Sequence, residues 1–279
     1  MNVFWFTGLV WAGSLVAGLL GALTGLGGGV VLVPMLALAF HVDLRYAIGA
    51  SLIAVIATSS GAASAYVREG YSNVRVGMFL EIATAAGAIA GAYIAIKVPK
   101  EGIGIVFGVV LLYSAWTSLS GHSEKRPESG TGGLARILRL DSQYPMVDGT
   151  LRSYHVTAVP MGFALMGVAG VLSGLLGIGS GAFKVLALDK VMRIPFKVST
   201  TTSNFMIGVT AASSAGLYLH RGYIDPGLTM PVILGVLLGS MIGARVLMKT
   251  RVAPLRKVFG IVIAATAIQM IYSSVTGGL

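Results

Sequence analysis

Two short glycine-rich clusters are the part of this sequence whose spacing best suits a ligand site. They are Gly25-Leu26-Gly27-Gly28-Gly29 and Gly177-Ile178-Gly179-Ser180-Gly181, each followed by a short apolar stretch. Unwound backbone at such a break can face a ligand, and the first N–H groups of the helix that follows have no partner within it. Because such groups favour anions, we expect an anion site here. The alternative is that the glycines only let helices turn or approach closely.

Polar residues near the clusters could complete this site. Lys184 follows the second cluster, where a buried cation would suit an anion, although its side chain could instead reach the membrane surface. Glu81 is the only acidic residue well inside an apolar stretch, so it could pair with Lys184 or carry a proton. Ser203 and Asn204 end a run of hydroxyl and amide residues at 199–204 that could replace part of an oxyanion's hydration shell. A single hydroxyl more often bonds a helical carbonyl.

The candidate residues therefore fall into two groups. The expected substrate-binding residues are Gly25, Gly27, Gly28, Gly29, Ser51, Gly177, Gly179, Ser180, Gly181, Lys184, Ser203 and Asn204. Glu81 is the expected coupling or ion-pairing residue.

Other chemistries lack the residues that they need. The absence of cysteine excludes disulfides, thiolate catalysis and cysteine-based metal sites. The histidines have no spacing suited to metal ligation or base catalysis, and they are His41, His122, His155 and His220. No paired carboxylates or Ser-His arrangement lie at membrane depth, so we predict neither an enzyme nor a metal or cofactor site. Basic residues lie in short loops beside helix ends, which argues against nucleic-acid binding despite the net charge of +10.

The composition indicates that lipid surrounds these residues. Apolar residues make up 55% of the chain and charged residues 11%, whereas soluble domains average about half and about a quarter. The apolar residues form ten stretches, at 5–23, 30–40, 46–67, 74–96, 103–119, 156–176, 182–188, 198–219, 228–248 and 258–272. Backbone groups in lipid must bond within their own segment, so we predict an all-α integral membrane protein. The first stretch lacks the features of a signal peptide, so we expect a retained span.

The sequence also repeats itself at an offset of 152 positions, from about Ala17 to Gly108. The two glycine clusters correspond to each other at this offset. Further matching pairs are Ser51 and Ser203, Thr58 and Thr210, Tyr66 and Tyr218, Tyr71 and Tyr223, and Gly91 and Gly243. A single constant offset argues against chance, so we predict two repeats of about five helical segments each.

The distribution of charge predicts how the repeats are oriented. We divide the chain into a first repeat of residues 1–119, a polar linker of residues 120–153 and a second repeat of residues 154–279. If each repeat changes sides an odd number of times, most lysines and arginines share one face with the linker. The other face receives only Arg45, Lys97, Lys100 and Arg221, with Lys184 and Arg245 in or near the membrane. Because positive loops are cytoplasmic, we predict inverted repeats, a cytoplasmic linker and external termini. Re-entrant hairpins and full passes of the short segments would give the same result.

The first glycine cluster followed by Val33-Pro34, its weaker second copy and the duplicated layout resemble the sulfite exporter TauE/SafE family. The resemblance covers nearly the whole chain outside the linker. It implies a bacterial inner-membrane permease for small sulfur-containing anions such as sulfite, sulfonates or sulfoacetate, driven by an ion gradient. The second copy departs from the pattern at Ser180 and at Leu186, which corresponds to Pro34. The two half-sites therefore need not contact a substrate equally.

These features together predict a secondary transporter that binds a small anion between the glycine-rich breaks and alternates access by rocking its halves. A passive anion channel could use the same residues. The expected partners are a small anionic substrate and the lipid bilayer. Glycines four residues apart, at Gly87 and Gly91, Gly239 and Gly243, and Gly104 and Gly108, suit close packing within the chain or in a homodimer.

Overall fold

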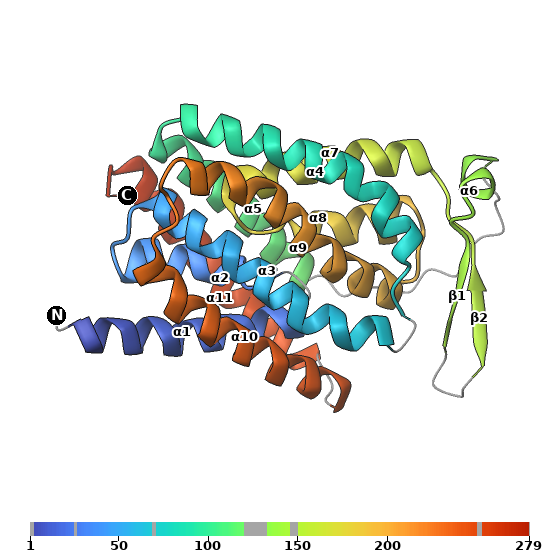
Figure 1. Cartoon of the computed structure of the whole chain (residues 1–279), viewed down its shortest axis with the longest axis horizontal. Coiled ribbons are helices and arrows are strands. Elements are labelled where there is room, and N and C mark those ends of the chain that lie inside the picture. The colour runs from blue at the N-terminus through green and yellow to red at the C-terminus, as the bar shows by residue number, and fades with distance from the viewer. Residues whose placement is uncertain are drawn as a thin grey trace.

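The computed structural model describes residues 3–24, 27–68, 71–119, 133–145, 150–249 and 253–278, and most of these are helical (Figure 1). The long helices are α1 (Val3–Thr24), α3 (Leu44–Arg68), α4 (Val74–Lys97), α5 (Lys100–Leu119), α7 (Val159–Leu176), α9 (Phe196–His220), α10 (Pro226–Lys249) and α11 (Ala253–Val275). Two short helices, α2 (Gly29–Pro34) and α8 (Gly181–Leu186), continue directly into the π-helices η1 (Met35–Ala39) and η2 (Ala187–Val191). The predicted helical membrane-protein class is confirmed.

The helix boundaries repeat at the offset found in the sequence. Adding 152 to the bounds of α2, η1, α3 and α4 gives the bounds of α8, η2, α9 and α10. The π-helix follows both Pro34 and its counterpart Leu186. Because Leu186 keeps its N–H, the missing N–H of a proline is not what produces the π-helix. The sequence difference at this position leaves the helix bounds unchanged.

Helices α3 and α9 run antiparallel beside each other through the middle of the molecule (Figure 1). Just after α3, the N–H of Asn73 donates to the hydroxyl of Thr202 near the start of α9, with an N···O distance of 3.0 Å. At the other end, the ring centroids of Tyr46 and Tyr223 lie 5.7 Å apart. Around this pair, α1 packs along α10 and α4 along α7, so the two copies are interleaved. How the copies face across a bilayer stays a prediction.

Each copy begins with a helical hairpin. α1 leads to the first glycine cluster and α2 with η1 returns along it, which brings the ring centroids of Phe6 and Phe40 to 5.6 Å. In the second copy, the N–H of Thr157 before α7 donates to the carbonyl of Met192 after η2, at 3.1 Å. The short apolar stretches therefore turn back to the end from which the hairpin starts.

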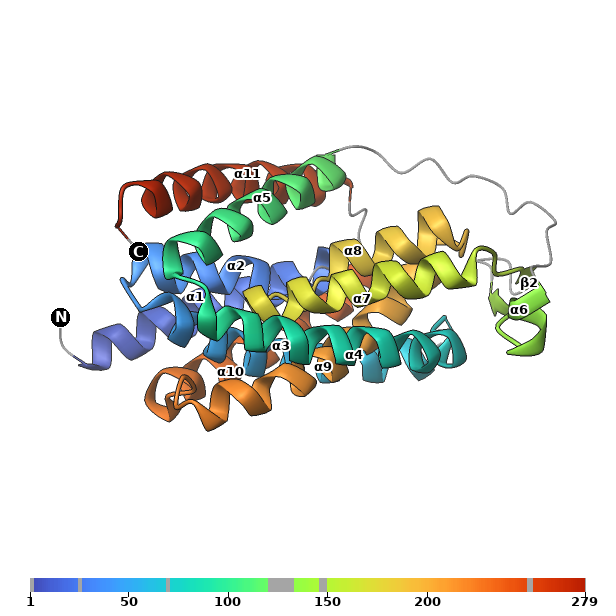
Figure 2. The ribbon, with the colours of Figure 1, turned by 90° about the horizontal axis from the view of Figure 1, so that it is seen from above.

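The glycine faces are used within the chain. A Cβ on Gly91 of α4 would lie 2.0 Å from the carbonyl oxygen of Val171 on α7. A Cβ on Gly239 of α10 would lie 2.0 Å from the carbonyl oxygen of Leu15 on α1. A Cβ on Gly108 of α5 would lie 2.3 Å from Cγ1 of Ile271 on α11, which lies alongside α5 at one side of the molecule (Figure 2). Of the two roles expected for these glycines, the structure shows close packing within the fold.

The outer faces of the helices expose large apolar side chains. Phe4, Ile82 and Met161 are 87%, 65% and 61% exposed. In the described part of the chain, five helices contain stretches long and apolar enough to cross a membrane, and they are α1, α3, α4, α7 and α10. Helix α9 is as long as α3, but its first half is rich in serine and threonine. Exposed apolar surface of this extent suits contact with lipid.

The linker carries a small β-hairpin that the sequence did not predict. It consists of β1 (Ser142–Pro145) and β2 (Leu151–Tyr154), preceded by the short helix α6 (Gly133–Ile137). The hairpin lies at the end of the molecule opposite the start of α1 and the end of α11 (Figures 1 and 2). Nδ2 of Asn73 ties the linker to the helices by donating to the Leu140 carbonyl at 2.9 Å and to the Tyr154 hydroxyl at 2.8 Å. Burial raises the pKa of Tyr154, which keeps this hydroxyl protonated.

Candidate functional site

The two glycine clusters contact each other partway along α3 and α9. A Cβ on Gly29 would lie 2.7 Å from the carbonyl oxygen of Gly177 and 3.0 Å from Cα of Ile178. The hydroxyl of Ser51 on α3 donates to the same Gly177 carbonyl with an O···O distance of 2.7 Å. Gly27 and Gly177 have φ angles of 82° and 69°, which favour glycine. The two glycine clusters form the tips of the two helical hairpins. These tips need glycine both to turn and to approach each other.

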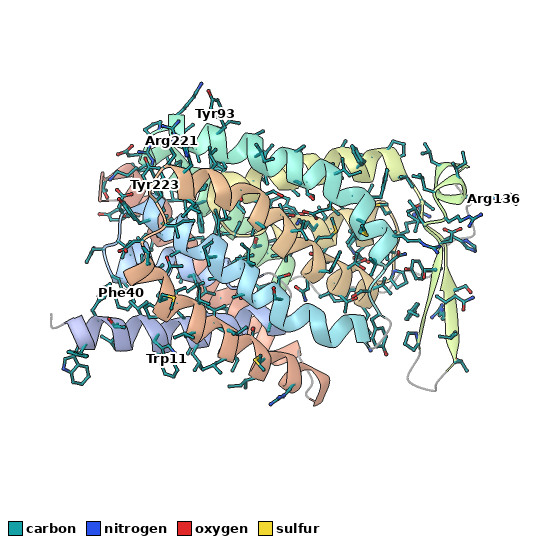
Figure 3. All side chains as sticks on the ribbon, in the orientation of Figure 1. Trp11, Phe40, Tyr93, Arg136, Arg221 and Tyr223 are labelled. Carbon is teal, nitrogen blue, oxygen red and sulfur yellow. The ribbon has the colours of Figure 1, made fainter. Side chains whose placement is uncertain are left out.

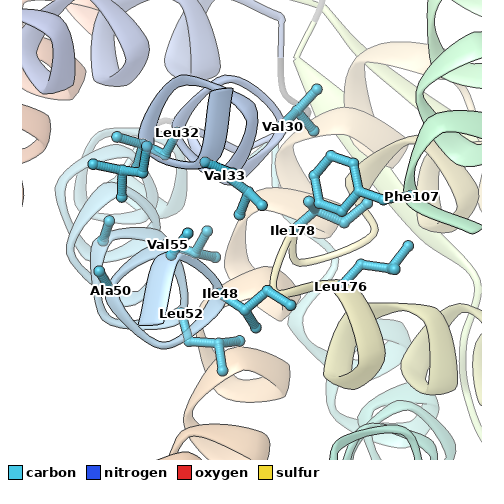
Figure 4. Packing of buried hydrophobic residues seen from close by; sticks show 14 of the residues in the cluster. Val30, Leu32, Val33, Ile48, Ala50, Leu52, Val55, Phe107, Leu176 and Ile178 are labelled. Carbon is cyan, nitrogen blue, oxygen red and sulfur yellow. The ribbon is translucent and has the colours of Figure 1, made fainter. Parts of the chain in front are cut away.

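Apolar side chains surround this contact (Figure 4). Ile178 lies next to Phe107 of α5 and faces Val30 and Val33 of α2. All four side chains are buried, with at most 3% of their surface exposed. A polar group beside the tips is therefore removed from water and depends on partners within the protein or on a ligand.

A buried cation and a buried carboxylate lie on either side of one hydroxyl near the second tip. Nζ of Lys184 on α8 donates to Oγ1 of Thr210 on α9. The Thr210 hydroxyl donates to Oε1 of Glu81 on α4 with an O···O distance of 2.6 Å. Lys184 and Thr210 are fully buried and Glu81 is 8% exposed. The burial of Lys184 excludes the alternative in which its side chain reaches the membrane surface.

Three of the predicted site residues each have a buried polar atom without a hydrogen-bond partner among the described residues. These atoms are Oγ of Ser180, Nδ2 of Asn204 and Oε2 of Glu81. Leaving a buried polar group unpaired costs about 1–3 kcal/mol. Atoms of this kind mark a place where a ligand can supply the missing bond. Ser180 and Asn204 can both donate, which suits an oxyanion.

Ser203 lies at the second tip, where its hydroxyl donates to the carbonyl of Gly181 at 3.4 Å. The hydroxyls at the start of the same run bond carbonyls four or five residues earlier in the chain. The hydroxyls of Ser199 and Thr200 donate to the carbonyls of Ile194 and Phe196, which is the common role of hydroxyls in helices.

The remaining predicted residues lie at or near the tips. Gly28 precedes α2, and Gly179 has a φ of 69°. Gly25 lies outside the described residues. The structure thus brings the described candidates from both copies together, while their role in binding stays a prediction.

Thr210 is the residue of this site that the sequence pattern does not single out. It lies seven residues after Ser203 on α9, and this spacing of two turns places both on one face of the helix. The equivalent hydroxyl in the first copy, that of Thr58, only donates to the Ala54 carbonyl at 2.8 Å. The first copy has Leu32 at the position of Lys184, so it has no cation to match.

Basic residues lie over tyrosine rings at both ends of the central helix pair. Nζ of Lys197 lies 3.7 Å from the ring centroid of Tyr71, near the linker. Cζ of Arg45 lies 5.8 Å from the ring centroid of Tyr223, at the end where Figure 3 also shows Arg221. These contacts are equivalent at the repeat offset, and each joins one copy to the other.

A multi-pass helical membrane protein in which two glycine-broken hairpins meet, and in which one of them carries a buried lysine bridged to a buried carboxylate, has the features of a transporter. The family described as Sulfite exporter TauE/SafE matches residues 10–270. The chain belongs to this family and is a membrane transporter of the TauE/SafE type.

Its relatives carry the same general description. The chain is similar to the probable membrane transporter protein YunE of Bacillus subtilis (strain 168), at 28% identity over 94% of this chain and 96% of the relative. The probable membrane transporter protein YdhB of the same organism is 28% identical over 79% of this chain and 82% of the relative. The probable membrane transporter protein ORF9 of Sinorhizobium sp is 22% identical over 96% and 93%. No solved structure matches the chain.

Proposed function

We propose that this chain is a secondary transporter, or permease, for a small sulfur-containing oxyanion such as sulfite, a sulfonate or sulfoacetate. The observation that carries the proposal is a fully buried lysine, Lys184, on the short helix α8 that begins at the second glycine cluster. A buried cation in a membrane protein is costly, so its presence indicates a function. The family to which the chain belongs is described as sulfite exporters, which favours a sulfur oxyanion as its substrate.

In this proposal the substrate binds where the tips meet. Lys184 supplies the opposite charge, and the unpaired donors of Ser180 and Asn204 replace water around the oxyanion. Ser51 and Ser203, which bond the backbone of the tips, hold the two clusters in place. The apolar side chains around the tips exclude water, which strengthens each of these contacts.

Transport then requires the site to open to one side of the membrane at a time. We propose that the copies are inverted across a bacterial cytoplasmic membrane, with external termini and a cytoplasmic linker. Rocking of the interleaved copies would expose the tips alternately, and an ion gradient would drive the cycle. A homodimer would use surfaces other than the internal glycine faces.

Flux of sulfur anions into vesicles tests the proposal. Purified protein in liposomes should accumulate labelled sulfite or a labelled sulfonate faster than protein-free liposomes. Lys184→Met should reduce the rate by at least about tenfold, because the buried countercharge is lost, and Ser203→Ala should reduce it less. Lys190→Met is the matched control, since this lysine is about half exposed at the end of η2. Wild-type flux equal to that of empty liposomes for every sulfur anion would refute the proposal.

A passive anion channel is the second candidate, because the same buried lysine would also serve a permeating anion. The two candidates differ in energetics. A channel only dissipates the gradient of its anion, whereas a secondary transporter accumulates anion when a proton or sodium gradient is imposed. Flux that ignores both ion gradients would favour the channel.

A further inference from the structure

We propose that Glu81 is the proton site of this transporter, and that its carboxylate and the transported anion alternate as the partner of Lys184. The inference rests on the proposed function and deepens it by naming the coupling ion. Proton and anion would then cross the membrane together and in the same direction.

The hydrogen bonds of Thr210 show how one proton could change the site. The Thr210 hydroxyl has a single hydrogen, and it has two acceptors within reach, Oε1 of Glu81 at 2.6 Å and the carbonyl of Met206 at 2.9 Å. When Glu81 is ionised, its carboxylate accepts the hydrogen bond from the Thr210 hydroxyl. The oxygen of the same hydroxyl accepts a hydrogen bond from Lys184. A protonated Glu81 can instead donate to the hydroxyl oxygen, whose hydrogen then turns to Met206. The change needs no movement of the backbone.

The balance of charge means that Lys184 can neutralise either the Glu81 carboxylate or the transported anion, but not both at once. Across Thr210 of α9, Lys184 is the charged group that faces Glu81. Helix α7, which packs along α4, contains no ionisable side chain, and the basic residues of α9 lie near its ends at Lys197 and His220. Arg75 of α4 is directed to the linker, where it bonds the Arg139 carbonyl at 3.5 Å.

An incoming monoanion would therefore create a net negative charge in a buried site if Glu81 stayed ionised. Such an uncompensated charge is expensive in a low-dielectric interior. Protonation of Glu81 removes the excess, so one proton accompanies each monoanion. The second carboxyl oxygen, Oε2, has no partner among the described residues and can take up the proton. A half-turn of the carboxyl group then brings the protonated oxygen to the Thr210 hydroxyl, to which it donates. When the anion leaves, Lys184 again attracts the carboxylate and the proton returns to water on that side.

Proton movement driven by an anion gradient tests this coupling directly. Wild-type protein is placed in liposomes that contain a trapped pH-sensitive dye, with the membrane voltage clamped, and methanesulfonate is added outside. Methanesulfonate is the anion of a strong acid, so it carries no proton itself. We expect the interior to become acidic at a rate of about one proton per labelled anion that enters.

The Glu81→Gln variant separates coupling from transport, since its neutral amide resembles the protonated carboxyl. We expect exchange of labelled for unlabelled methanesulfonate to continue, while acidification falls to the level of protein-free liposomes. Glu101→Gln is the matched control, because this carboxylate is exposed at the start of α5. Thr210→Val should weaken coupling, whereas Thr58→Val, which removes the equivalent hydroxyl of the other copy, should leave the ratio of protons to anions unchanged.

A binding measurement on the wild-type protein keeps the inference testable if Glu81→Gln does not fold. If one proton binds with each anion, the dissociation constant for methanesulfonate should rise about tenfold per pH unit above the titration of the carboxyl. A pH-independent constant would overturn the inference, as would methanesulfonate entry without acidification or acidification by Glu81→Gln. Absence of flux for every sulfur anion would instead overturn the proposed function.

Discussion

Ser180 combines a strained backbone with an unused hydroxyl. Its φ is 50° and it is 2% exposed, while its counterpart Gly28 has a φ of −63°. A non-glycine residue in this left-handed region costs about 1 kcal/mol. If the hydroxyl binds the substrate anion, this strain is retained because the side chain has a function.

Two substitutions at Ser180 separate strain from binding. Both variants remove the unpaired hydroxyl, but only Ser180→Gly also relieves the strain. The melting temperature of Ser180→Gly in detergent should therefore exceed that of Ser180→Ala by about 2 °C, which corresponds to about 1 kcal/mol of strain. Both should weaken anion binding to a similar extent, measured by titration calorimetry. If affinity were unchanged in both variants, the hydroxyl would have no contact with the anion.

Asp43 forms an ion pair outside the candidate site, so we expect it to contribute to the stability of the protein and not to anion binding. It lies before α3 and forms an ion pair with Lys100 at 3.0 Å. Burial alone would raise the pKa of Asp43, but hydrogen bonds from Lys100 and the Arg45 N–H lower it below its usual 3.8. A lowered pKa in the folded state stabilises the protein above the unfolded pKa, and this contribution is lost as the pH falls through the folded value.

Substitution of Asp43 should therefore matter only above the pH range in which it titrates. Because the side chains of Asp43 and Lys100 are 40% and 36% exposed, Asp43→Asn should cost no more than about 0.5 kcal/mol at pH 7. The difference from wild type should disappear as the pH falls below 3.8 and through the lowered pKa of the folded state. Chemical unfolding at pH 7 and across this acid range measures it, and a difference that persisted in acid would exclude the ion pair as its cause.

At the scale of helices, the pairing of α4 with α7 depends on glycine. A Cβ on Gly174 of α7 would lie 1.9 Å from the carbonyl oxygen of Ala88 on α4. Gly174→Ala should therefore force the helices apart and destabilise the protein by about 1–3 kcal/mol. Gly216→Ala is the control, because nothing lies within 4 Å of its Cβ position on α9. This control should be neutral or stabilising, since alanine favours helix, and thermal unfolding in detergent compares the two.

The helices and their repeat could be predicted from the sequence, whereas their pairing could not. Long apolar stretches and a constant offset are properties of one chain segment or of two aligned ones, so both are visible in the residues. The return of α2 along α1 was left open because a hairpin and two passes give the same charge distribution. The β-hairpin of the linker could not be predicted, because residues 142–154 show no clear alternation of apolar and polar side chains.

The same limit applies to the candidate site. Lys184 and Glu81 could be selected because a charge stands out within an apolar stretch. Thr210 could not be selected, because one threonine among many in α9 shows its role only when α4 and α8 meet beside it. Residues that bridge distant segments become visible only with the tertiary packing.

At the scale of the whole molecule, the two cation–π contacts lie at opposite ends of the central pair and join opposite copies. If the copies rock against each other, the contact at the opening end must lengthen. Nζ of Lys197 lies 3.7 Å from its ring centroid and Cζ of Arg45 lies 5.8 Å from its own, so both contacts are present in this structure. A cation–π contact contributes about 0.5–2 kcal/mol, which is sufficient to change the balance between two open states several-fold.

Loss of either tyrosine should therefore favour opening at its own end. Because the chain has no cysteine, Ser203→Cys provides a single reporter at the tips that reacts with a membrane-impermeant thiol reagent. With this reporter, Tyr71→Leu should raise the labelling rate from the linker side about threefold or more, and Tyr223→Leu should do so from the side of the termini. Tyr272→Leu on α11, where the side chain is 70% exposed, is the control. Equal acceleration from both sides by one variant would indicate general loosening of the fold and would contradict two separate closures.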